Sequence, residues 1–110
     1  MPGVRTITLL DRQFECQHLA DASFQDVAAV YLILSVSETE PTRVLDVGQT
    51  GQLGQRMDTH ERMQCWLGNA GDGVIWVCMH RMPTSQYTLQ DRLDFEQKLR
   101  IGLEPRCGER

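Results

Sequence analysis

The distribution of apolar and polar positions predicts a hairpin near the middle of the chain. Residues 29–37 (AVYLILSVS) begin with apolar side chains on both faces, as expected for a strand inside a sheet. Residues 38–42 are polar and contain Pro41, which cannot donate to a sheet ladder, so they predict a turn. Residues 43–49 (RVLDVGQ) then return as the second strand.

Two more segments have strand character. Residues 4–10 are rich in β-branched side chains and are expected at a sheet edge, whereas residues 74–82 form a third core strand that ends before Pro83. Residues 11–28 are mixed and predict only a short helical turn near 23–27.

Two segments have helical spacing of their apolar residues. Residues 52–63 follow Thr50, whose hydroxyl can cap a helix, and residues 86–103 follow Thr84 and Ser85, which can do the same.

The order of these elements predicts one domain over residues 1–110, with an N-terminal extension at 1–28 and a core at 29–105. We expect an α/β layer of the α+β type. In it a small three-stranded, mostly antiparallel sheet is flanked by helices, and the N-terminal extension adds one strand.

The charge of the chain limits the partners that it can bind. Fifteen acidic and eleven basic residues give a net charge of −4, which disfavours a non-specific nucleic-acid binder with a broadly basic surface. The imbalance lies in residues 1–50, so an anion-binding surface is expected in residues 51–110. Ten of the eleven bases are arginine, whose planar guanidinium suits phosphate and carboxylate groups.

Apolar runs and cysteines indicate the compartment. No apolar run exceeds eight residues and the N-terminus lacks a secretory signal, so we expect no membrane span and a cytoplasmic location. The four cysteines contain no CxxC pair and are expected to be free thiols. A minor alternative is a zinc site with suitable donors but irregular spacing, formed by His60, Cys65, Cys78 and His80.

One carboxylate has an unusual position on the C-terminal helix. Four leucines mark an apolar stripe on this helix: Leu89, Leu93, Leu99 and Leu103. At 100° per residue, Glu96 falls near the middle of this stripe. Because a buried carboxylate is costly unless it is paired or binds a cation, Glu96 is either an ion-pair partner of Arg92 or Arg56 or a metal-binding or catalytic residue.

The predicted helix at 52–63 carries a similar anomaly. His60 lies on its apolar stripe with Arg56 at the edge, and their spacing of four residues lets both side chains reach one site above the sheet. The structural interpretation is a core histidine that hydrogen bonds to the backbone.

Tyr31 and Asp46 are polar residues on otherwise apolar hairpin strands. If residue 31 lies opposite residue 48, and 33 opposite 46, both side chains project from the same face of the sheet. Gly48 has no side chain, which lets another group approach the backbone closely. The structural interpretation of Tyr31 is a packing residue with its hydroxyl at a rim.

Taken together, these positions resemble the motifs of the GIY-YIG nuclease family. Residues 29–31 (AVY) stand where the family has Gly-Ile-Tyr, and residues 46–50 (DVGQT) stand where it has Tyr-Ile-Gly-Gln-Thr. Leu53, Arg56 and His60 match its following Asn-Leu-x-x-Arg-x-x-x-His stretch.

The similarity extends to the C-terminal helix, where residues 92–99 fit the helix that carries the family's glutamate. It therefore covers residues 29–105. The resemblance implies a metal-dependent endonuclease that hydrolyses phosphodiester bonds, with DNA as the expected substrate.

The resemblance also implies roles for individual residues. Tyr31 would act as general base or position the water, Arg56 would stabilise charge on the phosphate, and His60 would assist proton transfer or orientation. Glu96 would bind one Mg²⁺ (or Mn²⁺) ion.

The substrate and its targeting follow from the same resemblance. The motif residues Gly48, Gln49 and Thr50 would contact the substrate. Because the chain is little more than a nuclease core, a homodimer or a targeting partner protein is expected to direct it.

The main departure from the family pattern is Asp46, which stands where the family has its second tyrosine. A carboxylate places negative charge beside a phosphate and donates no proton at neutral pH unless its pKa is raised. It can instead add an oxygen ligand for Mg²⁺ or act as the base, which makes Asp46 a candidate catalytic residue. The alternative function is a catalytically degenerate domain that binds nucleic acid or protein, which the acidic pI and the single lysine favour.

Overall fold

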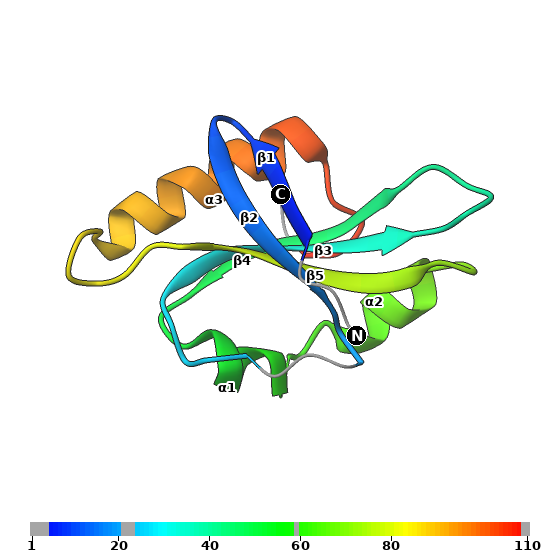
Figure 1. Ribbon diagram of the computed structural model, residues 1–110, viewed down its shortest axis with the longest axis horizontal. Helices are drawn as coiled ribbons and strands as arrows, with labels where there is room; N and C mark the ends of the chain where they lie inside the picture. Colours follow the sequence, from blue (N-terminus) through cyan, green and yellow to red (C-terminus); the bar gives the residue numbers. More distant parts are fainter. Residues whose placement is uncertain (1–4, 21–23, 59, 109–110) are drawn as a thin grey trace.

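The computed structural model describes residues 5–20, 24–58 and 60–108, which contain a five-stranded sheet (Figure 1). The strands are β1 (Arg5–Leu9), β2 (Arg12–His18), β3 (Ala29–Val36), β4 (Arg43–Thr50) and β5 (Val74–Arg81). They are ordered β1-β2-β5-β3-β4, and each neighbouring pair is antiparallel. The α+β prediction is confirmed, but the sheet is larger than a three-stranded core with one added strand.

Helices cover both faces of the sheet. The described residues form α1 (Leu53–Asp58) and α2 (Met63–Asn69) on one face and α3 (Leu89–Leu103) on the other (Figure 1). Trp66 of α2 packs in the core of the first face, and Leu99 of α3 packs in the core of the second. β3 is buried on both faces because it lies between these two cores, as its continuous apolar pattern predicts.

The predicted register of the hairpin is confirmed. Tyr31 lies opposite Gly48 and Ile33 lies opposite Asp46, so all four residues share the face that α1 and α2 cover. A bulge after Ile33 shifts the remaining pairs by one residue.

The prediction for residues 11–28 is wrong, because they contain the strand β2. Residues 24–28 form no helix, and residues 21–23 lie outside the described part of the chain. The turn between β1 and β2 has positive φ at Leu10 (50°) and Asp11 (61°), the geometry of a two-residue type I′ turn. Such turns are recognised by Asn-Gly or Asp-Gly, and neither pair is present here.

Within the predicted helix at 52–63, the described residues form one helix, α1, at Leu53–Asp58, and a second helix, α2, begins at Met63. Nδ1 of His60 accepts a hydrogen bond from the backbone N–H of Arg62 at 3.1 Å, and this local bond replaces the one that a continuous helix would make. The buried apolar residues of α1 are therefore Leu53 and Met57, and the buried residue of α2 is Trp66.

The last helix starts later than predicted and buries only part of the predicted stripe. Thr88, not Thr84 or Ser85, is its N-cap, and it forms a capping box with Asp91. Leu89 and Leu93 of the predicted stripe are 53% and 37% exposed. The buried residues of α3 are Leu99 and two arginines, Arg92 and Arg100.

The cysteines are not the free thiols that we expected. Cys16 of β2 is bonded to Cys78 of β5, and Cys65 of α2 is bonded to Cys107 of the C-terminal segment. The zinc interpretation fails for the same reason, because Cys65 and Cys78 are both committed to disulfides. None of the helices in the described part of the chain has the length and apolar character to cross a bilayer.

Candidate functional site

A pocket of about 570 Å³ lies beside β4, the last strand of the sheet on that side. Because β4 is an edge strand, side chains from α3 on one face and from the α1–α2 segment on the other meet around it. The lining residues come from both faces and the C-terminal segment: Tyr31, Gly48, Gln49, Arg56, Arg62, Glu96, Gln97, Arg100 and Gly108. Five of the eight predicted site residues are among them.

The phenol of Tyr31 lies directly over Gly48. The two residues are partners across the β3–β4 ladder, and a Cβ atom at position 48 would collide with the Tyr31 hydroxyl. The close approach expected at Gly48 is therefore made by Tyr31. Burial raises the pKa of Tyr31 to about 12, although the charge of Arg56 acts in the opposite direction, so the phenol is protonated at neutral pH.

His60 holds the Tyr31 hydroxyl in place. Its Nε2 lies 2.6 Å from Tyr31 Oη, and Trp66 packs against the imidazole with ring centroids 4.3 Å apart. Burial, assisted by the charges of Arg56 and Arg62, lowers the pKa of His60 to about 4. The imidazole is therefore neutral at pH 7. Because Nδ1 accepts from the backbone of Arg62, the proton is on Nε2 and is donated to Tyr31.

Arg56, in α1, lies beside Tyr31 and pairs with Glu61. Both guanidinium Nη atoms donate to the Glu61 carboxylate, with 2.7 Å from Nη2 to Oε1. The Glu61 side chain is 58% exposed, and the hydrogen bond from Arg56 lowers its pKa to about 2. Arg56 is thus a half-buried cation at the pocket wall whose partner can move into solvent.

Asp46 is fully buried beneath the pocket, 0% exposed, and its carboxylate is surrounded by donors. Oδ2 accepts from Nε of Arg62 at 2.7 Å and from Nε1 of Trp66 at 2.8 Å. Oδ1 accepts from Nη2 of Arg62 at 3.2 Å, from Nη2 of Arg100 at 3.0 Å and from the Val47 N–H at 2.9 Å. Two arginines therefore face one carboxylate.

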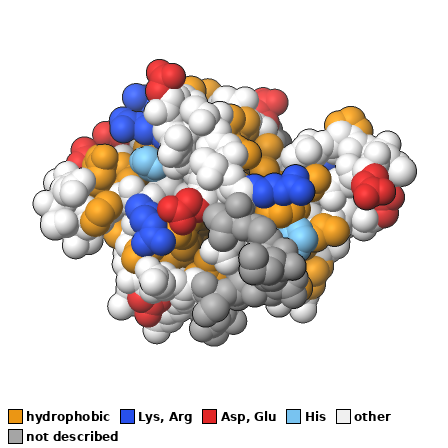
Figure 2. All heavy atoms as spheres, viewed as in Figure 1, with side chains coloured by type: hydrophobic (Ala, Val, Ile, Leu, Met, Phe, Trp, Pro, Cys, Tyr) orange, Lys and Arg blue, Asp and Glu red, His pale blue; other side chains and the backbone are white. Residues whose placement is uncertain are grey.

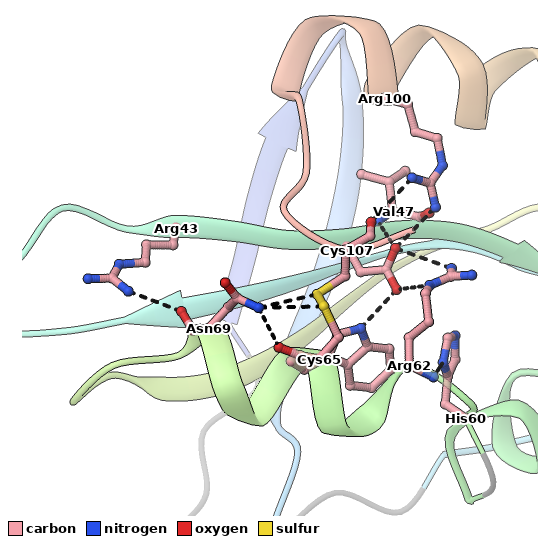
Figure 3. Close-up of a disulfide and its surroundings, with 10 residues drawn as sticks. Arg43, Val47, His60, Arg62, Cys65, Asn69, Arg100 and Cys107 are labelled. Carbon is pink, nitrogen blue, oxygen red and sulfur yellow. Dashed lines mark hydrogen bonds and ion pairs between the residues drawn. A yellow bond between two sulfur atoms is a disulfide. The ribbon is translucent and has the colours of Figure 1, made fainter. Parts of the chain in front are cut away.

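Arg62 and Arg100 reach Asp46 from opposite sides of β4 (Figure 3). Arg100 comes from α3 and also donates to the carbonyl oxygen of Val47, which lies on the open edge of the strand. Farther along this edge, the N–H groups of Arg106 and Cys107 donate to carbonyl groups of β4. The Cys65–Cys107 disulfide joins this C-terminal segment to α2.

Glu96 is half-buried on α3 and lines the pocket from the side of the sheet opposite α1 and α2. Burial raises the pKa of its carboxyl group, and the charges of Arg100 and Arg62 act against that rise. Neither partner predicted for it is engaged with it. Arg56 pairs with Glu61, and Nε of Arg92 donates to the side chain of Gln49 at 3.1 Å.

Gln49 and Thr50 have different surroundings. Gln49 lines the pocket, whereas Thr50 lies in an adjacent depression with Arg56 and accepts a hydrogen bond from the Gln52 N–H at 3.0 Å. Thr50 therefore shapes the entry to α1 rather than the pocket itself.

Sequence reasoning missed two cationic residues of the site, Arg62 and Arg100. Arg92, Glu96 and Arg100 recur every four residues on α3, a spacing that places them on one face and that could have indicated Arg100. No pattern indicated Arg62, because its role depends on the break between α1 and α2.

Glu96 is the one carboxylate that the described part of the chain contributes to the pocket lining, and Arg56, Arg62 and Arg100 are the cations there. No group of three or more His, Cys, Asp and Glu side chains gathers among the described residues. Mg²⁺ commonly uses only one or two protein carboxylates and completes its shell with water and substrate phosphate. Glu96 fits this requirement, whereas the carboxylate of Asp46 is occupied by its donors.

Comparison of the chain with protein-family profiles, curated proteins and solved structures finds no match. The function of the site therefore rests on the geometry of the pocket and on the motifs of the sequence.

Proposed function

We propose that this protein is a metal-dependent endonuclease that hydrolyses phosphodiester bonds in nucleic acid, with DNA as the substrate and a GIY-YIG-like site. The observation that carries the proposal is that Tyr31, Arg56 and Glu96 line a single pocket. His60 lies behind this wall and contacts the Tyr31 hydroxyl. These residues come from different parts of the chain, and the sequence motifs indicate each of them. A tyrosine held by a neutral histidine, next to an arginine and a single carboxylate, suits phosphoryl chemistry.

Arg56 supports the proposal through its charge and shape. Its guanidinium already binds one carboxylate through two nitrogens, which is the geometry that a phosphate group also accepts. In the proposed reaction a phosphate displaces Glu61 from Arg56, and the arginine stabilises the negative charge that grows on the phosphate oxygens.

Tyr31 and His60 position the attacking water in this proposal. Tyr31 Oη accepts a hydrogen bond from the Nε2–H of His60, which leaves the hydroxyl proton of Tyr31 for a hydrogen bond in the pocket. A neutral phenol at this place orients a water molecule or a phosphate oxygen. His60 is neutral and already carries a proton on Nε2, so it acts by orienting Tyr31.

Glu96 is the residue that would hold Mg²⁺ or Mn²⁺. When bound, the ion would polarise the phosphate and stabilise the leaving oxygen. Because the raised pKa of Glu96 favours its protonated form, ion binding should weaken as the pH falls.

A double-stranded substrate would be held by a small number of contacts. Basic side chains lie in separate groups among acidic ones on the face shown in Figure 2, without a continuous basic surface there. We therefore propose that a second copy of the chain or a targeting protein adds affinity.

A cytoplasmic location stays part of the proposal. Because the four cysteines form two disulfides, free thiols no longer support that location.

Cleavage of supercoiled and branched DNA with Mg²⁺ or Mn²⁺ tests the proposal. We expect Glu96→Gln to lower the rate by about 10²-fold or more, because the carboxylate that holds the ion is lost. Asp94→Asn is the matched control, since Asp94 is an exposed carboxylate on the same helix, bonded to Gln90. Equal activity of the wild type and Glu96→Gln would indicate a contaminating nuclease and overturn the proposal.

A second candidate function is a binding domain without catalysis. The pairing of Arg56 with Glu61 and the commitment of Asp46 to its donors favour it, because neither residue is then poised for chemistry. DNA binding without cleavage in either metal would support this function. No DNA affinity at low salt would leave a protein partner as the ligand.

A further inference from the structure

We propose that Arg62 is a second phosphate-binding residue of this pocket, that Asp46 positions it, and that Glu61 occupies the anion position between Arg62 and Arg56. This inference deepens the proposed function and rests on it, because the ligand is a phosphate of a nucleic-acid backbone. It assigns Asp46 a positioning role in place of a second catalytic carboxylate.

The first step concerns how Arg62 is held. Its Nε and Nη2 atoms both donate to Asp46, so the guanidinium plane is fixed from below by a fully buried carboxylate. A guanidinium has five N–H donors, and its remaining edge is available to another group. Arg62 lines the pocket and its side chain is 26% exposed, so this edge is accessible to a ligand.

The second step concerns charge. Asp46 faces both Arg62 and Arg100, and the carboxylates of Glu61 and Glu96 lie near the same guanidinium groups. Both arginines line the pocket, but the side chain of Arg100 is 8% exposed and donates to Val47, whereas the side chain of Arg62 is 26% exposed. Of the two arginines bound to Asp46, Arg62 is therefore the more accessible to a ligand in the pocket.

The third step is the anion that the structure already contains. The Glu61 carboxylate binds both Nη atoms of Arg56 and lies 3.6 Å from Nη1 of Arg62. A single anionic group therefore contacts both guanidinium groups, and the Glu61 side chain is more than half exposed, so it can leave at little cost. A phosphate has oxygens enough to bind both arginines in its place.

The test is binding of a 20-base-pair DNA duplex in EDTA, measured by fluorescence anisotropy over a series of salt concentrations. Arg62→Gln should weaken binding about tenfold and reduce the slope of log K against log salt by about 0.9, the value for one lost phosphate contact. Arg43→Gln is the control, because Arg43 also pairs with a glutamate, Glu40, but lies outside the pocket. An unchanged slope for Arg62→Gln would overturn the inference.

Glu61→Gln is a second variant that leaves the buried cluster intact. It should tighten DNA binding several-fold, because a competing anion is removed. Unchanged or weaker binding by this variant would contradict the inference even if Arg62→Gln failed to fold. Absence of wild-type binding at low salt would also overturn it.

Cleavage by the same proteins separates the two proposals. Binding that depends on Arg62 without any cleavage would support the phosphate position and refute the nuclease. If the wild type cleaves DNA and the binding of Arg62→Gln keeps the wild-type salt slope, the nuclease would be supported and the phosphate position refuted.

Discussion

His60 and Asp46 together determine the chemistry of the pocket at the scale of single residues. Each has a buried polar side chain whose atoms are hydrogen bonded to other groups of the protein. For Asp46, removal of a donor would leave a buried charge short of partners, a change that costs about 3–5 kcal/mol in other proteins. A tyrosine at position 46 would leave Arg62 and Arg100 without their shared carboxylate, so this replacement alone should not improve the site.

The pH dependence of stability tests the state of His60. Its pKa is about 4 in the folded protein and near 6.5 when unfolded, so the unfolded chain binds the proton more readily. The stabilising contribution is complete above pH 6.5 and is lost as the pH falls toward 4, by at most about 3 kcal/mol. Urea unfolding of the wild type and of His60→Gln should show this difference. If the free energy of unfolding depends on pH in the same way in both proteins, the lowered pKa of His60 is contradicted.

Residue-scale sequence reasoning identified Tyr31, Arg56, His60 and Glu96 because each is polar at a position expected to be apolar, or matches a motif. Arg62 was not identified, because it is an ordinary charged residue in a turn and gains its role only from Asp46. The burial of Asp46 was visible as a polar residue on an apolar strand, but four of its five donors come from residues 16 to 54 positions away, in Arg62, Trp66 and Arg100.

At the scale of elements, the β3–β4 hairpin positions the site, and Gly48 is its most constrained residue. Gly48→Ala should displace the Tyr31 phenol, break its hydrogen bond with His60 and lower cleavage about a hundredfold. Gly51→Ala is the matched control, because the space around residue 51 is open. Cleavage assays, with thermal unfolding to check the fold, measure the effect. Equal activity of the two variants would show that Tyr31 tolerates displacement.

The hairpin was predictable from sequence and the other elements less so, for physical reasons. Residues 29–49 combine a continuous apolar run, a proline turn and a register that alternation determines. β2 joins the sheet through a turn at Leu10 and Asp11, which lacks the Asn-Gly or Asp-Gly pair that marks such turns. The helix predicted at 52–63 is interrupted by the hydrogen bond from the Arg62 N–H to the His60 side chain. On α3 the leucine spacing indicated the face that packs on the sheet, where Leu99 is buried and Leu103 packs beside it. It did not indicate that Arg92 and Arg100 share this face and bond to groups of β4.

At the scale of the whole molecule, the site depends on how its C-terminal segment is attached. Replacing Cys65 and Cys107 by serine should lower stability by about 2–5 kcal/mol and also reduce cleavage, because the segment beside Arg100 is released. Replacing Cys16 and Cys78 should lower stability with little effect on cleavage, since that disulfide joins β2 and β5 away from the pocket. Thermal unfolding and plasmid cleavage of both double variants distinguish the two bonds. Equal loss of cleavage in both would indicate a general loss of stability.

The two disulfides interleave along the chain, since Cys65 lies between Cys16 and Cys78, and Cys107 lies beyond them. A single protease cut anywhere between residues 16 and 107 therefore leaves both fragments covalently joined through at least one bridge. The cleaved, oxidised protein would therefore migrate as a single band on a denaturing gel, and a reducing agent would separate its two fragments. A nick in an exposed turn could then be introduced deliberately, to give two ends near the pocket without loss of either half.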